Sequence, residues 1–161
     1  MKNEFDGATV SARSKLGDSN GGLIPIHDYR DLTVWQKAVE LTTVTYTLLH
    51  GFPPHERFGL CSQMQRAATS VASNIAEGNA HRHRGHYLHH LDIARGSLFE
   101  LSTQLEIAQR LGYVSDIEAA PSRTLIESVS RMLYRLTSML RSAPALPVPS
   151  RVPKPPPSPR A

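Results

Sequence analysis

The chain has 161 residues and a formal net charge of +4, with 40% hydrophobic and only 6% aromatic residues. This length fits one domain, and the modest apolar content indicates that part of the chain lies outside the core. The single cysteine, Cys61, excludes an intramolecular disulfide and fits a reducing compartment. No stretch resembles a signal peptide or reaches the roughly 18 apolar residues of a membrane span, so we expect a soluble, cytoplasmic protein.

Both ends of the chain lack the apolar periodicity of a folded segment. Residues 1–27 are rich in Gly, Ser, Asn and Asp, the composition of a flexible leader. Residues 142–161 hold eight of the 12 prolines and three basic residues without an acid, and proline removes backbone donors that helices need. We therefore expect a disordered, proline-rich basic tail. It carries most of the net charge, because residues 28–141 hold 12 basic and 11 acidic residues.

Helical periodicity begins in the first half of the central segment. Residues 31–50 place apolar side chains three to four positions apart, and Thr33 and Gln36 have the spacing of a capping box. Residues 56–77 show the same periodicity, and Gly78 follows where a C-terminal cap is expected. Both segments are predicted to be helices.

Two longer helices are predicted in the second half. Residues 83–111 carry leucines along one face, and Gly112 is expected to stop them. Residues 115–141 open with Ser115 and Glu118, a second candidate capping box. Apolar side chains then recur at helical spacing to the end of this segment.

The last helix contains one awkward residue, Pro121. Either the helix kinks there, or a short turn precedes a helix that restarts at Pro121. No segment alternates apolar and polar residues as a strand would. Short connections between four helices force antiparallel neighbours, so we predict an all-α, antiparallel up-down four-helix bundle over residues 28–141.

A polar seam runs along the second and third predicted helices. On the second helix it consists of Gln63, Arg66, Ser70, Ser73, Asn74 and Glu77, and on the third of Asp92, Arg95, Gly96, Glu100, Thr103 and Gln104. The first interpretation is an ordinary hydrated face, and the second is a subunit interface or a partly buried hydrogen-bond network. Gly96 favours the second, because a glycine inside a helix costs about 1 kcal/mol against alanine but admits a neighbouring backbone.

Three stretches of the chain resemble the 23S rRNA intervening-sequence protein family, also called S23-like. They are DYRDLTVWQKAVEL (residues 28–41), FGLCSQMQRAATSVASNIAEG (58–78) and IARGSLFELSTQLEIAQRLGY (93–113). The resemblance covers residues 28–141 and implies a bacterial four-helix bundle that assembles as a homopentamer, with no established enzymatic activity. Some members are encoded within intervening sequences of 23S rRNA genes. The family is also similar to the accessory variability determinant of diversity-generating retroelements, a pentamer that binds nucleic acid and a reverse transcriptase.

The resemblance extends to individual positions, and the chain departs from the family pattern in three places. The family's characteristic positions here are Trp35, Gln63, Arg66, Ala67, Ser73, Asn74, Glu77, Gly78, Arg95, Gly96, Ser97, Glu100 and Gln104. Ala72 stands where the family often has proline, and Ser102 where it often has glutamate. The segment HRHRGH, residues 81–86, stands where the family usually has Ser, Lys and Glu, so its histidines are individual to this chain.

Five histidines fall within ten residues: His81, His83, His86, His89 and His90. Two of them can share a helical face, but zinc requires a third or fourth ligand. His83 and Asp92 are the local candidates, but neither a Glu-x-x-His motif nor a cysteine pair is present. No nucleophile is placed beside a histidine by local sequence, and no glycine-rich phosphate loop occurs. We therefore predict no catalytic residue, no metal and no cofactor.

The same segment has a second interpretation as an anion contact. The start of a helix attracts phosphate through its free N–H groups and dipole, and Arg82 and Arg84 add fixed charge. The candidate nucleic-acid contacts are His81, Arg82, His83, Arg84, His86 and Tyr87, the last offering an aromatic face. The alternative is a solvated polar turn.

The sequence thus leads to a non-enzymatic, self-associating protein that binds nucleic acid or a ribonucleoprotein. The alternative is a protein-interaction scaffold, such as a reverse-transcriptase accessory subunit without direct RNA contact. The candidate interface or network residues are Gln63, Arg66, Asn74, Glu77, Arg95, Gly96, Glu100 and Gln104.

Overall fold

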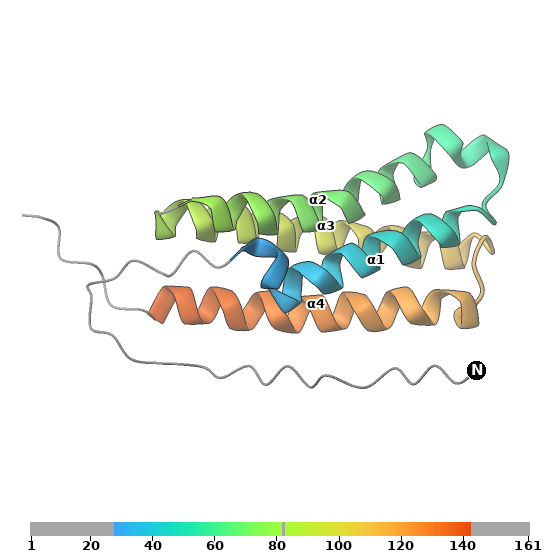
Figure 1. The fold of residues 1–161 in the computed structure, drawn as a ribbon. Helices are drawn as coiled ribbons and strands as arrows, with labels where there is room; N and C mark the ends of the chain where they lie inside the picture. The colour runs from blue at the N-terminus through green and yellow to red at the C-terminus, as the bar shows by residue number, and fades with distance from the viewer. Residues whose placement is uncertain (1–27, 82, 143–161) are drawn as a thin grey trace, which may run out of the picture. The chain divides into compact units, whose positions relative to one another are not determined.

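The computed structural model describes residues 28–81 and 83–142, so the predicted leader and nearly all of the predicted tail lie outside the described residues. The helices are α1 (Thr33–Leu49), α2 (Leu60–Ala80), α3 (Arg84–Arg110) and α4 (Asp116–Ser142), with short 3-10 turns η1 (Tyr29–Asp31) and η2 (Pro54–Phe58). Consecutive helices run in opposite directions (Figure 1). The described residues contain no strand, and the predicted all-α four-helix bundle is confirmed.

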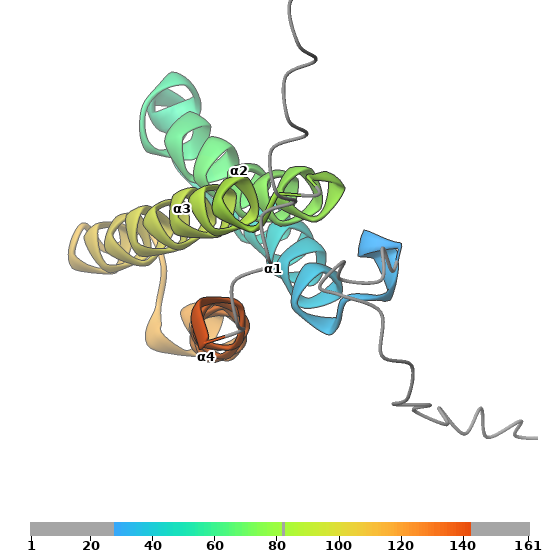
Figure 2. The same ribbon diagram turned by 90° about the vertical axis from the view of Figure 1, so that its left-hand side faces the viewer.

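The helices form a ring in chain order. Each packs against the helices before and after it, α4 closes the ring against α1, and the backbones of the diagonal pairs, α1–α3 and α2–α4, do not approach each other closely. The tightest pairing is between α2 and α3. Figure 2 views the bundle end-on and shows α4 standing beside α1 and α3 while α2 crosses close to α3. The α2–α3 pair is therefore the most extensive helix–helix contact of the fold.

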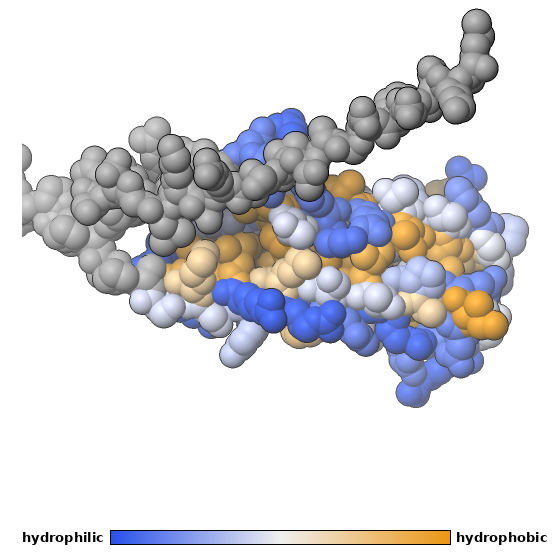
Figure 3. All heavy atoms as spheres, turned by 60° about the horizontal axis from the view of Figure 1, so that its bottom comes forward, coloured by the Kyte–Doolittle hydropathy of each residue, from blue (hydrophilic) through white to orange (hydrophobic). Residues whose placement is uncertain are grey.

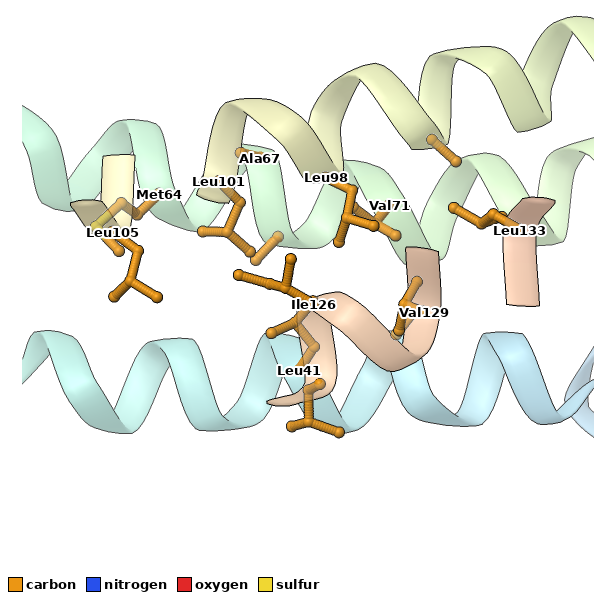
Figure 4. Close-up of a cluster of buried hydrophobic side chains, with 14 of the residues drawn as sticks. Leu41, Met64, Ala67, Val71, Leu98, Leu101, Leu105, Ile126, Val129 and Leu133 are labelled. Carbon is orange, nitrogen blue, oxygen red and sulfur yellow. The ribbon is translucent and has the colours of Figure 1, made fainter. Parts of the chain in front are cut away.

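Apolar stripes from all four helices meet in one core. Figure 4 shows side chains from each helix converging, among them Leu41, Met64, Ala67, Val71, Leu98, Leu101, Leu105, Ile126, Val129 and Leu133. Burying a leucine-sized side chain contributes roughly 1.5–3 kcal/mol, so these stripes account for helix pairing. Apolar residues also remain on the surface, where they form a broken band among polar ones on the face drawn in Figure 3.

The end of α3 and the start of α4 follow the predicted signals. Gly112 adopts a positive φ of 73°, and its N–H donates to the Gln109 carbonyl at 2.9 Å while that of Tyr113 reaches the Ala108 carbonyl at 3.0 Å. This is the Schellman pattern that satisfies the last carbonyls of a helix. At the start of α4, the Ser115 N–H donates to the Glu118 carboxylate at 2.9 Å, which confirms the capping box.

One other local prediction is wrong, and one of the two alternatives for Pro121 is excluded. The N-cap of α1 is Leu32, which makes no side-chain cap hydrogen bond, and Gln36 instead donates to the Arg30 carbonyl at 2.9 Å. The Thr33–Gln36 capping box is therefore wrong, because η1 precedes the helix and presents its own acceptor. At Pro121 the helix does not restart, since α4 already begins at Asp116 and runs through the proline.

Gly78 was predicted to be the C-terminal cap of α2, but it does not cap the helix. The helix continues to Ala80, and Gly112 is the only described residue with a positive φ. A Cβ on Gly78 would lie 2.7 Å from Tyr87 Cδ2 and 3.0 Å from His90 Cβ. The glycine is therefore required by the close approach of α3, and the cap prediction is wrong.

We predict that Gly78→Ala lowers the free energy of unfolding by about 1–3 kcal/mol, because an added methyl overpacks the α2–α3 contact. The control is Gly85→Ala on α3, where a Cβ meets nothing within 4 Å; there alanine should be neutral or stabilise by up to about 1 kcal/mol. Urea unfolding followed by circular dichroism measures both. Equal effects of the two substitutions would contradict the close-packing explanation.

Candidate functional site

The predicted polar helix entrance lies in the short link between α2 and α3. His81 is the C-cap of α2, and its N–H donates to the Gly78 carbonyl at 3.1 Å. His83 is the N-cap of α3, which begins at Arg84. Arg82 lies outside the described residues. We call His81, His83, Arg84, His86, His89 and His90 the histidine turn.

Five imidazoles gather at this end of the bundle. The rings of His81 and His90 are stacked, with centroids 5.1 Å apart and planes inclined by 15°. His86 lies 5.4 Å from His81 and 6.0 Å from His83, and His89 lies 5.9 Å from His90. The link folds His81 back over α3, so residues from both helices form one cluster. Four of the five rings are exposed, and His90 is partly buried.

A chain of hydrogen bonds joins the histidine turn to the middle of the α2–α3 contact. The Asn74 amide donates to the Ser70 carbonyl at 2.9 Å and to the Ser70 hydroxyl at 3.1 Å. This orientation leaves Asn74 Oδ1 to accept from His90 Nδ1 at 3.1 Å. The Ser70 and Ser97 hydroxyls bond each other at 2.8 Å, and a Glu77 carboxylate oxygen lies 3.5 Å from His90 Nδ1. Part of the polar seam is thus a hydrogen-bond network within one chain.

The remaining seam residues of α2 face outward. Gln63, Arg66, Ser73 and Glu77 are all exposed. Within the described part of the chain, no carboxylate forms an ion pair with Arg66. The structure therefore divides this seam. Ser70 and Asn74 are directed to α3, Glu77 is exposed but lies near His90 of α3, and Gln63, Arg66 and Ser73 face solvent.

The seam residues of α3 are divided in a similar way. Arg95 pairs with Asp92 at 3.4 Å on the surface. Gln104 is buried and donates to Glu100 at 3.0 Å, while its own Oε1 has no partner among the described residues. Gly96 is exposed, and a Cβ there would meet nothing within 4 Å. No neighbour among the described residues requires a glycine at that position.

Tyr87 does not offer an aromatic face to a ligand. Its side chain is only 6% exposed, because its ring packs beneath Gly78. Burial also raises the pKa of the Tyr87 phenol. The prediction of a nucleic-acid contact at Tyr87 is wrong for this reason. The signal was present in the sequence, since Tyr87 precedes Leu91 and Ala94 of the core stripe by four and seven residues.

The arrangement of the histidine side chains does not favour a metal site. In residues 28–81 and 83–142, no three His, Cys, Asp or Glu side chains are grouped to hold a metal ion. The nearly parallel rings of His81 and His90 cannot both direct an in-plane lone pair at one ion.

Burial, and next the charge of Glu56, raise the pKa of the Cys61 thiol, which disfavours the thiolate that a nucleophile needs.

A second polar and aromatic corner, missed at the level of sequence, lies at the other end of α2. A cavity of about 530 Å³ opens there beside Tyr46, Arg57 and Phe58. Phe58 is 88% exposed. A single exposed aromatic residue in a connection has no periodic signature, so the only hint was the cluster of aromatic, basic and proline residues between the first two predicted helices.

None of the described helices has the length and apolar character needed to cross a membrane. No curated protein matches the chain. A solved structure from Bacteroides thetaiotaomicron, described as a protein of unknown function from the S23 ribosomal protein family, is 21% identical, with a TM-score of 0.59 over 65% of this chain and 98% of that one. The sequence model of the 23S rRNA-intervening sequence proteins matches residues 30–135. Since that match spans more than half of the 161 residues, the chain belongs to the 23S rRNA-intervening sequence protein family.

Proposed function

We propose that this protein is a non-enzymatic, self-associating member of its family that contacts nucleic-acid phosphates through the histidine turn. The observation that carries the proposal is the cluster of five imidazoles at the start of α3. His83 makes no side-chain cap hydrogen bond, and the first turn of α3 contains no acid. Its N–H groups and positive dipole end therefore favour an anion.

The chemistry of the exposed side chains supports a phosphate ligand. Imidazole N–H groups donate hydrogen bonds whether the ring is neutral or charged, and Arg82 and Arg84 supply permanent positive charge. Glu77 is the opposing charge at this site, and its carboxylate lies toward His90. Contacts of this type bind phosphate groups without reading sequence.

Self-association is the second part of the proposal, with the homopentamer of the family resemblance as the expected assembly. Ile93, Gly96, Phe99 and Ile107 are all exposed on α3, and Phe99 is 56% exposed. Apolar residues grouped around an exposed glycine suit a subunit contact. Five copies of the histidine turn would then act together, so that a weak phosphate contact gains avidity.

The alternative is a protein-interaction scaffold, such as an accessory subunit of a reverse transcriptase that makes no direct RNA contact. The same exposed face of α3 favours it, because that face suits a protein partner as well as a second copy. We place either function in the cytoplasm, where the thiol of Cys61 remains reduced.

We predict that the full-length protein binds a labelled RNA hairpin with an affinity that falls steeply with salt. Replacing both Arg82 and Arg84 by alanine should weaken binding and reduce the slope of log K against log salt by about 1–2. The matched control replaces Arg110 and Arg131, two exposed arginines paired with Glu106 and Glu127. Absence of binding at low salt, or an equal effect of the control, contradicts phosphate contact at the histidine turn.

Self-association is tested with two glycine variants. Gly96→Ala should weaken assembly by about 5- to 150-fold, since a methyl at a close backbone contact overpacks it by roughly 1–3 kcal/mol. Gly85→Ala should leave assembly unchanged, although a Cβ on either glycine would meet no atom of the described residues within 4 Å. Light scattering over a concentration series measures both. A native chain that is monomeric at micromolar concentration refutes this part of the proposal.

A further inference from the structure

The corner where α1 passes into α2 contains a cavity that the histidine turn does not involve. Its volume is about 530 Å³, within the range of small-ligand sites. Tyr46 lines it from α1 and His50 from the C-cap of that helix. Arg57 and Phe58 line it from η2, and Ser62 and Gln65 from the first turns of α2. In Figure 1 this corner lies at the right-hand end of α2, and the histidine turn lies at the left-hand end.

Two aromatic rings are presented to solvent at this corner. Phe58 is 88% exposed and Tyr46 is 42% exposed. The Arg57 guanidinium lies 5.6 Å from the centroid of the Phe58 ring, a distance at which a cation is attracted to an aromatic face. An apolar ring kept in water beside a cation offers a platform for a flat, conjugated partner.

The charge at the corner is one-sided. No carboxylate lines the cavity, and no ion pair to Arg57 occurs in the described part of the chain. The nearest acid in sequence, Glu56, is engaged elsewhere, because its carboxylate accepts from the Leu60 N–H at 2.9 Å and from the Tyr113 hydroxyl at 3.3 Å. The corner therefore selects a ligand that combines negative charge with an aromatic ring.

We propose that this corner binds an unpaired nucleotide of single-stranded nucleic acid. Phe58 and Tyr46 stack against the base, and Arg57 and His50 contact its phosphate. This inference rests on the proposed function, because it takes nucleic acid as the ligand and adds a second contact that reads unpaired bases. Stacking on aromatic residues is tolerant of sequence, since every base has a π-face.

The outer face of α2 connects the two contacts. From Leu60 to Ala76 the helix contains no acidic residue. Arg66, Thr69 and Ser73 are exposed along this length. A strand that starts at the corner and follows α2 toward the histidine turn therefore meets no carboxylate of this helix before Glu77.

The test is fluorescence anisotropy of the full chain with a labelled 12-nucleotide oligo(dT), a length in the range of about 4–16 nucleotides used by single-strand sites. Phe58→Ala should weaken binding by about 5- to 100-fold, and Arg57→Gln should weaken it and lower the salt dependence. Phe58→Trp should retain binding, and its emission should be quenched by the stacked base. The control is Tyr134→Ala, an aromatic residue on α4 that is 67% exposed and should leave binding unchanged.

Two results would overturn the inference directly. One is equal affinity for oligo(dT) and for an abasic strand of the same length, because stacking requires a base. The other is a Phe58→Ala variant that binds normally but changes the mass measured by light scattering, which would make Phe58 a subunit contact.

The variants also separate this inference from the proposed function. Loss of binding on replacing Arg82 and Arg84, with none on replacing Phe58, overturns the inference and leaves the histidine turn in place. Loss of binding on replacing Phe58, with none on replacing Arg82 and Arg84, supports the inference and contradicts a phosphate contact at the histidine turn. Absence of any nucleic-acid binding at low salt overturns both.

Discussion

The close approach of α2 and α3 at Gly78 is the contact on which the histidine turn depends. Because residue 78 has no side chain, the ring of Tyr87 and the Cβ of His90 reach distances that a methyl group would prevent. Tyr87 is buried as a result, His90 is held beside Asn74, and the other imidazoles remain at the surface. A larger residue at this position would push the start of α3 outward and disperse the imidazole cluster.

The helices and two of their boundaries could be predicted because their determinants are local. Gly112 and the Ser115–Glu118 pair act on partners only a few residues away. Predictions failed where the partner is distant in sequence or in another element. Gly78 was taken for a cap because its need for space comes from α3, and Tyr87 was taken for a surface residue because its burial comes from α2.

In the candidate site, too, features set by local sequence could be predicted, and features set by distant contacts could not. The spacing of the histidines indicated one polar cluster, but the stacking of His81 on His90 depends on how the link folds back over α3. The polar seam left two interpretations open, and the structure assigns Ser70 and Ser97 to a bond within the chain. Phe58 and Arg57 gave no periodic pattern, so only the three-dimensional arrangement identifies their corner.

The length of α2 has a consequence for selectivity. Its 21 residues form a stiff rod of about 30 Å, and the Ser70–Ser97 bond fixes its register against α3. If both ends of α2 engage one strand, the protein measures the distance between an unpaired base and a phosphate further along. Discrimination among RNAs would then depend on the length of the unpaired segment, with little regard to which bases it contains.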